Sequence, residues 1–349
     1  MESAGGLLIY QRMKLVCENK ISSDQAGGMA RNGSVQQIIR VVEEVQTRVW
    51  YSECDAGPTN HVVLALLDVS KAFDRFYRPL LIRKLIDFGI NSKLLTCLVA
   101  YFYDRRQRVR VGDEFSDTMS TLNGGPQGSV IVLLCWLLYI NDVASKCQTV
   151  GSALFVDDLA LWLSGRNASD VISKVNTDLS AIYGWSIFNS VVFDFKKFHL
   201  FDLGKQRVPN SLKSQVRFGP GTPPWSQTAM YLGLLFDKKL SFVDTMNRTH
   251  ERITDRTRFW RLFSHTDRVT GSSPRTLEII FKVWFLPLIE YASPIWIFRI
   301  RDFRLFHISA PVLSEYSKAF TKLNTFYMKC ARNILGVPPV FMLTLCVLY

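Results

Sequence analysis

The chain has 349 residues, of which 48% are hydrophobic and 21% are charged, and its formal net charge is +12. This length can bury a substantial core divided into two or three subdomains. The excess of positive charge favours a polyanionic partner such as nucleic acid. The longest apolar runs, at 130–140 and 340–349, are too short to span a bilayer. We therefore expect no insertion into a membrane, and the seven cysteines, which form no CxxC pair, indicate an intracellular protein.

Taken in chain order, the pattern predicts alternating helices and strands. A helix is expected from Ser34, where apolar residues recur at helical spacing. Residues 61–67 form an apolar run of strand length that ends in Asp68. Two helices follow, the first ending at Gly89 and the second capped by Asn91.

Two sets of arginines lie at regular spacing. One set alternates along a predicted strand at 105–111, and the other recurs every four residues on a predicted helix. Like charges on one face repel each other unless water or phosphate neutralises them. A solvated surface and a nucleic-acid backbone contact are therefore both open for each set. The sets are Arg106, Arg108 and Arg110, and Arg248, Arg252 and Arg256.

The candidate catalytic chemistry lies at 154–162, where two adjacent carboxylates stand between apolar runs of strand-like composition. This pattern predicts a β-hairpin with Asp157 and Asp158 at or near its tip. A solvated turn is the simpler explanation for a lone pair of acids. Asp68, which also follows a strand-like run, adds a third carboxylate. Carboxylates that converge from separate strands are the ligands of two-metal nucleotidyl transfer, and Mg²⁺ prefers such oxygen donors.

A fourth carboxylate, Asp74, lies six residues after Asp68. Its neighbours Arg75 and Arg78 are cations within reach along the chain. We therefore assign Asp74 to a local salt bridge and not to metal binding.

Five segments carry a resemblance to a known family. In chain order they are LLDVSKAFDRF at 66–76, GGPQGSV with LLYIND at 124–142, LFVDDLALW at 154–162, FDFKK at 193–197 and YLGLLFDKKLSF at 231–242. They resemble successive motifs of reverse transcriptases, and the non-LTR, LINE-type retrotransposon family is the best match. Because the motifs occur in order and with family-like spacing, the resemblance is far more specific than an acidic pair alone.

The resemblance implies an α+β fold, namely a right-hand polymerase with a ferredoxin-like palm, partial fingers and a helical thumb. The segment 231–242 resembles the primer-grip hairpin and is expected to turn at Asp237 and Lys238. Segments 289–296 and 320–339 resemble the helical thumb and connection. The implied domains are partial fingers at 1–61, the first palm strand at 62–76, fingers at 77–124, the remaining palm at 125–244, and a truncated thumb or connection at 245–349.

The resemblance also implies RNA-directed DNA polymerisation, in which a primer 3′-hydroxyl attacks the α-phosphate of a dNTP. The implied partners are an RNA template, a DNA primer, dNTPs and an endonuclease domain of the parent polyprotein, with no membrane. Two Mg²⁺ ions, or Mn²⁺ in their place, would be held by the catalytic residues Asp68, Asp157 and Asp158.

Further roles follow from the same resemblance. Phe73 would lie under the sugar of the incoming nucleotide and exclude a 2′-hydroxyl, and both arginine sets would contact the nucleic-acid backbone. The simpler alternatives are a core phenylalanine, a plain turn at 126–128 and a surface lysine at 197. The implied nucleotide-binding residues are Phe73, Pro126, Gln127, Gly128 and Lys197, and the implied primer grip is Tyr231, Leu232 and Gly233.

The chain departs from the family pattern at 25–34, where Gly28 and Met29 stand in place of the usual Phe and Arg. That arginine would contact the nucleotide phosphates, and Arg31 is a candidate substitute. Restoring Phe and Arg at these positions is expected to strengthen dNTP binding. The fingers strands that usually precede this segment are expected to be missing. These departures leave open a catalytically weak or inactive remnant that binds nucleic acid, and a maturase of the group II intron type.

Overall fold

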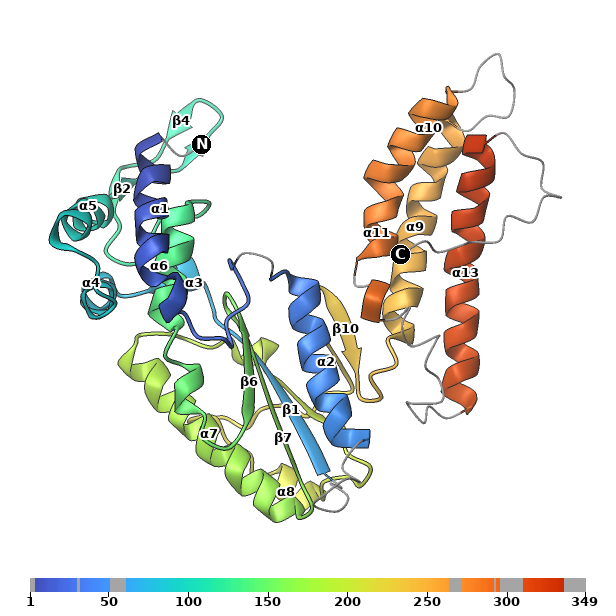
Figure 1. Cartoon of the computed structure of the whole chain (residues 1–349), viewed down its shortest axis with the longest axis horizontal. Coiled ribbons are helices and arrows are strands. Elements are labelled where there is room, and N and C mark those ends of the chain that lie inside the picture. The colour runs from blue at the N-terminus through green and yellow to red at the C-terminus, as the bar shows by residue number, and fades with distance from the viewer. Residues whose placement is uncertain are drawn as a thin grey trace. The chain divides into compact units, whose positions relative to one another are not determined.

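The computed structural model describes residues 4–29, 32–50, 61–263, 272–291, 293–295 and 310–335. The chain divides into two units, residues 1–226 and 227–349 (Figure 1). Arg31, the apolar run at 340–349 and parts of both thumb-like segments lie outside the described residues.

A four-stranded antiparallel sheet forms the centre of the first unit, in the order β6-β7-β1-β8. Its strands are β1 (His61–Asp68), β6 (Gly151–Phe155), β7 (Asp158–Gly165) and β8 (His199–Asp202). Numbered along the chain, the order is 2-3-1-4. The connection from β1 to β6 ends in α6 (Val130–Ile140), and α7 (Ala168–Phe188) connects β7 to β8. This is the split βαβ arrangement of the ferredoxin-like fold, so the predicted palm topology is confirmed.

Helices cover both faces of this sheet, which explains why β1 is apolar without alternation. Every residue of β1 except Asp68 is buried, as expected for a strand covered on both sides. The side chains of Val63, Ala65 and Leu67 join the main core together with residues of α7. α2 (Ser34–Trp50) packs against β1, β6 and β7 from the other face (Figure 1). Burial on both faces thus stabilises β1, and Asp68 lies at its less buried end.

A helical group packs around α6 at one end of the sheet (Figure 1). α6 is buried along almost its whole length, as expected for a helix that is hydrophobic all round. The predicted helices ending near Gly89 and capped by Asn91 are confirmed, and the Asn91 side chain accepts the Leu94 N–H at 2.9 Å. The group comprises α1 (Ala4–Cys17), α3 (Ala72–Arg75), α4 (Arg78–Asp87) and α5 (Ser92–Phe102).

Residues 105–121 form an exposed β arm in two short ladders, which corrects the prediction of one continuous strand at 105–111. β2 (Arg106–Gln107) pairs with β5 (Met119–Ser120), and β3 (Arg110–Val111) pairs with β4 (Glu114–Phe115). Between the ladders, the Ser116 hydroxyl accepts the Val109 N–H at 2.9 Å. A side chain therefore replaces a backbone partner there, and the ladder is interrupted.

The second unit contains a hairpin and four described α-helices. The hairpin strands are β9 (Thr228–Tyr231) and β10 (Leu234–Asp237), and the helices are α9 (Val243–Phe263), α10 (Pro274–Ile280), α11 (Leu286–Glu290) and α13 (Ala310–Leu335). A π-helical turn, Phe281–Phe285, joins α10 to α11. No helix in the described ranges is both long enough and apolar enough to cross a membrane.

The hairpin turns at Leu232 and Gly233, so the predicted turn at Asp237 and Lys238 is wrong. Both turn residues have positive φ, 47° and 79°, as in a type I′ turn, whose twist matches that of the flanking strands. The Asp237 carboxylate instead accepts backbone N–H groups of the loop that follows, including that of Phe242 at 2.9 Å. Asp237 therefore organises the exit from the hairpin.

Candidate active site

The three candidate catalytic acids meet at one end of the central sheet. Asp68 is the last residue of β1, and Asp158, the first residue of β7, is its partner across the ladder. Val156 and Asp157 form the two-residue turn between β6 and β7, which confirms the predicted hairpin. The Val69 N–H donates to the Asp157 carbonyl at 3.2 Å. The hairpin tip is therefore hydrogen-bonded to the chain that leaves β1.

Burial and neighbouring negative charge raise the pKa of both hairpin acids, Asp157 and Asp158. Burial, followed by the charges of Asp157 and Asp68, raises the pKa of Asp158 to about 7. Burial and the charge of Asp68 also raise the pKa of Asp157. A bound cation would remove this electrostatic repulsion between the carboxylates.

Lys197, in the turn η3 (Phe195–Lys197), supplies a positive charge to this cluster. Its Nζ lies 3.1 and 3.0 Å from the two carboxylate oxygens of Asp68. That hydrogen bond raises the pKa of Lys197. The predicted nucleotide-binding lysine is thus brought to the acids, where it contacts a carboxylate.

The donor set suits a hard divalent cation, although the carboxylates are not yet gathered as ligands. Within the ranges that the structure describes, no group of three His, Cys, Asp or Glu side chains is arranged to hold a metal ion. Asp68 is paired with Lys197, while Asp157 and Asp158 carry the raised pKa values expected of carboxylates without a counter-ion. Three oxygen donors of this kind match the preference of Mg²⁺.

The segment expected to line the nucleotide pocket is attached to the turn after β1. The Gly125 N–H donates to the Phe73 carbonyl at 2.8 Å, and the Gln127 Nε2 donates to Asp74 Oδ1 at 3.0 Å. Phe73 is half-buried, and its ring centroid lies 6.3 Å from that of Trp136. Gly128 is exposed, has φ +86° and has open space where a Cβ would lie. Phe73 and the loop 124–128 are therefore held together, beyond the end of the strand that carries Asp68.

The salt bridge predicted for Asp74 is not formed with Arg78. The Arg78 side chain is buried, and it donates to the carbonyls of Thr121, Asn123 and Gly124 at 2.5–3.0 Å. The Asp74 carboxylate instead accepts a hydrogen bond from the Gln127 side chain. The Arg78 guanidinium binds these loop carbonyls, because buried carbonyl groups without a hydrogen-bond donor cost free energy.

The segment 25–29 lies against the catalytic hairpin in a form that excludes a phenylalanine at 28. Gly28 has φ +71°, and a Cβ there would lie 2.8 Å from the Leu137 Cδ1. A Cβ at Gly27 would lie 2.5 Å from the Val156 nitrogen. Phe at position 28 would therefore be strained in this backbone, which bears against the expectation that Phe at 28 with Arg at 29 would strengthen dNTP binding.

The primer-grip residues and the second arginine set belong to the second unit. Tyr231, Leu232 and Gly233 lie at the β9–β10 turn, where the Tyr291 hydroxyl donates to the Leu232 carbonyl. On α9, Arg248 Nη1 contacts the Met230 sulfur at 3.3 Å. The Arg256 Nη1 donates to the Trp284 carbonyl at 2.7 Å. Arg248 and Arg256 therefore both have partners, whereas the Arg252 side chain is exposed.

The first arginine set lies on the exposed arm and is divided by the break in the ladder. The Cζ atoms of Arg108 and Arg110 lie 3.9 and 5.4 Å from the centroid of the Phe115 ring. Arg106 lies in the other ladder, with its Nε 3.5 Å from Asp104 Oδ1. Two of the three predicted guanidiniums therefore share one exposed aromatic surface.

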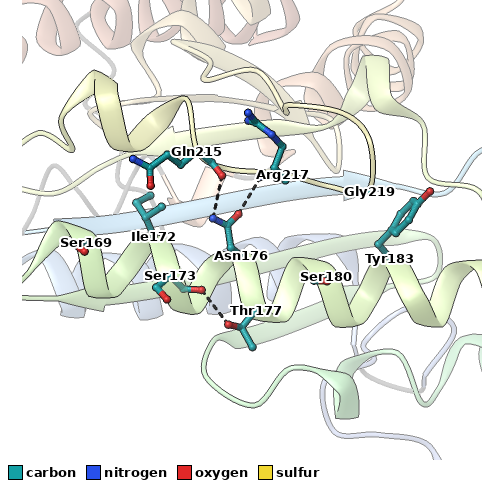
Figure 2. Close-up of a pocket in the computed structure, with 10 residues that line it drawn as sticks. All are labelled: Ser169, Ile172, Ser173, Asn176, Thr177, Ser180, Tyr183, Gln215, Arg217 and Gly219. Atoms are coloured by element: carbon teal, nitrogen blue, oxygen red, sulfur yellow. Dashed lines mark hydrogen bonds between the residues drawn. The ribbon is translucent and has the colours of Figure 1, made fainter.

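A cavity of about 720 Å³ lies elsewhere in the first unit, along α7 (Figure 2). None of the predicted site residues lines it. The Asn176 side chain donates to the Gln215 carbonyl at 3.1 Å and accepts the Arg217 N–H at 2.9 Å (Figure 2). The polar groups of the cavity wall thus hold the segment 215–219 against α7. We therefore assign no ligand to this cavity.

Two contacts of the catalytic hairpin were not predicted from the sequence. The Gln25 side chain accepts the Val156 N–H, and the Trp136 side chain donates to the Val156 carbonyl. Gln25 is 131 residues away from Val156 along the chain, and Trp136 is 20 residues away. No local pattern reports contacts over such separations.

The fold of the first unit is that of a polymerase palm. The chain belongs to the reverse transcriptase (RNA-dependent DNA polymerase) family, whose profile matches residues 8–236. The resemblance found in the sequence motifs is therefore confirmed.

Two curated relatives come from Drosophila melanogaster. The chain is 26% identical over 281 residues to "Probable RNA-directed DNA polymerase from transposon X-element", a match that covers 78% of this chain and 29% of the relative. It is 23% identical over 314 residues to "Probable RNA-directed DNA polymerase from transposon BS", covering 84% and 32%. The chain thus spans about a third of the length of these relatives.

Among solved structures, the chain is similar to apo telomerase from Candida tropicalis. The TM-score is 0.47 with 10% identity, over 95% of this chain and 58% of the telomerase. It is also similar to telomerase from Candida albicans, with a TM-score of 0.45 and 11% identity, over 94% and 50%.

Proposed function

We propose that this chain is the polymerase portion of a non-LTR retrotransposon protein and that it catalyses RNA-directed DNA synthesis. The observation that carries the proposal is the meeting of Asp68, Asp157 and Asp158 where β1 and the β6–β7 hairpin end side by side. The family match supports the same activity, and so do the RNA-directed DNA polymerases from transposons that resemble the chain.

The three aspartates would hold two Mg²⁺ ions, for which Mn²⁺ is a substitute. When bound, such ions lower the pKa of the attacking hydroxyl and neutralise charge on the transferred phosphate and the leaving group. The carboxylates must be ionised to serve as ligands, so the raised pKa values of Asp157 and Asp158 oppose metal binding below neutral pH. The contact between Lys197 and Asp68 must open when the metal enters, and the freed ammonium is then available for the triphosphate.

Phe73 and the loop 126–128 would select and orient the incoming dNTP. Phe73 is fixed through its carbonyl by Gly125 and through its ring by Trp136, so its position is defined before substrate binds. A fixed aromatic ring under the sugar would exclude the 2′-hydroxyl of a ribonucleotide. Gly128 leaves room for backbone to approach the base pair or the template.

Template and primer would be bound mainly through their phosphates. The net charge of +12 and the arginine sets on the β arm and on α9 support this contact. In the second unit, Tyr231, Leu232 and Gly233 would hold the primer end. An endonuclease domain in the parent protein and a nuclear location are consistent with the retrotransposon assignment and belong to this proposal.

Primer extension on a homopolymeric RNA template, with dNTPs and Mg²⁺, tests the activity. Wild type should extend the primer, Asp157→Asn should not, and Asp117→Asn, an exposed acid on the β arm, should behave as wild type. Retained binding of template–primer without extension by wild type would favour the inactive remnant. Equal extension by wild type and Asp157→Asn would refute the assigned site.

A further inference from the structure

Val156, the residue before the first hairpin acid, has an unusual backbone conformation. Its φ is +58°, in the left-handed region, which is strongly disfavoured for a β-branched residue. Val156 is the first residue of a two-residue turn whose ladder pairs Phe155 with Asp158. The turn geometry that places Asp157 therefore depends on a conformation that valine does not prefer.

Two side chains from distant elements hold the peptide groups of Val156. The Gln25 Oε1 accepts the Val156 N–H at 3.0 Å and the Gly27 N–H at 2.9 Å. The Trp136 Nε1–H donates to the Val156 carbonyl at 2.9 Å. Gln25 and Trp136 are 2% and 1% exposed, so these hydrogen bonds are shielded from water. The two hydrogen bonds to Val156 are called the Val156 contacts below.

The backbone of Gln25 is itself fixed to the edge of the sheet. The Ala26 N–H donates to the Leu154 carbonyl at 2.9 Å, and the Leu154 N–H donates to the Asp24 carbonyl at 2.8 Å. Arg40 of α2 adds a hydrogen bond of 2.7 Å to the Asp24 carboxylate. The segment around Gln25 thus extends the sheet beyond β6, and its side chain reaches the hairpin from a rigid base.

The side-chain oxygen of Gln25 is the atom that contacts the hairpin backbone. Both of its contacts are backbone N–H donors, which defines the orientation of the side-chain amide. Its Nε2 is buried without a hydrogen-bond partner among the described residues.

We propose that Gln25 and Trp136 are positioning residues that hold Val156 in its left-handed conformation and so orient Asp157 and Asp158. This inference rests on the proposed polymerase function. The ring of Trp136 also lies against Phe73, so one side chain connects the hairpin with the residue assigned to sugar selection. Neither residue touches the reacting atoms, and both act through the backbone of Val156.

The test removes each Val156 contact in turn; Gln25→Met nearly preserves side-chain size, whereas Trp136→Phe also removes part of a buried ring. Gln25→Met removes the acceptor, and Trp136→Phe removes the donor. Gln46→Met and Trp185→Phe are matched controls, because both side chains are buried and their Nε2 and Nε1 have no partner among the described residues. Hydrogen exchange of the Val156 amide, measured without metal or nucleotide, is the first readout.

Exchange of the Val156 amide should become at least about tenfold faster in Gln25→Met and stay unchanged in Gln46→Met, since the Gln25 Oε1 is the acceptor of this amide. The kcat for dNTP incorporation should fall about ten- to a hundredfold in Gln25→Met, because a small misplacement of catalytic groups has effects of this size. The KM for dNTP should change less than about twofold, and Trp136→Phe should lower kcat in the same way.

Rescue separates positioning from general destabilisation. Glycine adopts positive φ without steric cost, so in a Val156→Gly background Gln25→Met should reduce kcat by less than about twofold. Unchanged exchange of the Val156 amide in Gln25→Met, or an undiminished loss of kcat in the Val156→Gly background, would overturn the proposal. If wild type does not polymerise, the proposed function fails, while amide exchange still decides whether Gln25 holds Val156.

Discussion

Replacing Asp158 by asparagine should stabilise the metal-free protein at neutral and alkaline pH. Burial and the charges of Asp157 and Asp68 raise the pKa of Asp158 from 3.8 to about 7 in the folded state. The folded state therefore binds this proton more tightly than the unfolded state. The resulting contribution to stability is fully present below about pH 4 and is lost as the pH rises through 7.

The size of the effect follows from the same shift. The difference between 7 and 3.8 is about three pKa units, which corresponds to about 4 kcal/mol at about 1.4 kcal/mol per unit. The acids are partly solvated, so we expect about 2 kcal/mol. For a folded unit of this size, that is a rise in Tm of about 4–8 °C.

Thermal unfolding in EDTA at pH 4 and pH 8 measures this difference. Asp158→Asn should melt higher than wild type at pH 8 and almost identically at pH 4. Adding Mg²⁺ at pH 8 should stabilise wild type and not the variant, since the ion removes the same repulsion. Asp117→Asn, an exposed carboxylate, should follow wild type throughout. A variant no more stable than wild type in EDTA at pH 8 would refute the electrostatic account of the site.

Three further results are expected. Gly28→Ala should lower the free energy of unfolding by about 1–2 kcal/mol in urea titrations, because φ is +71° and the new Cβ would meet Leu137; unchanged stability would show that the loop adapts. Phe73→Val should raise the incorporation of ribonucleotides relative to deoxyribonucleotides, and an unaltered ratio in an active variant would leave Phe73 a core residue. RNA binding should weaken about tenfold or more between 50 and 200 mM salt, and Arg108→Ala should lower the slope of log K against log salt by about one; an unchanged slope would exclude a phosphate contact.

The parts of the site that could be predicted from the sequence are those encoded locally. The continuous apolar run before Asp68 predicts a strand buried on both faces, and the acids between two apolar runs predict the hairpin. The order of the motifs then indicates which strands must be neighbours. Burial and chain order therefore suffice to bring Asp68, Asp157 and Asp158 together.

The remaining features depend on contacts between distant residues or on backbone conformation. The Gln25 side chain meets Val156 across a separation of 131 residues, and nothing near Gln25 in the sequence indicates this contact. The family pattern has a phenylalanine at position 28, whereas the backbone of Gly28 has φ +71°, a conformation that favours glycine. The turn at Leu232 and Gly233 is hard to predict from the sequence, because leucine is an unusual turn residue. The Asp-Lys pair further on contains aspartate, which is common in turns.

The rate of a single nucleotide addition tests the central claim, that the three aspartates form a polymerase site. Under single-turnover conditions with saturating Mg²⁺ and dNTP, Asp157→Asn should add a nucleotide about 10³-fold more slowly than wild type. Its affinity for template–primer should be unchanged, because the residues proposed to contact the phosphates lie elsewhere. Equal rates for wild type and Asp157→Asn, with both extending the primer, would contradict the account.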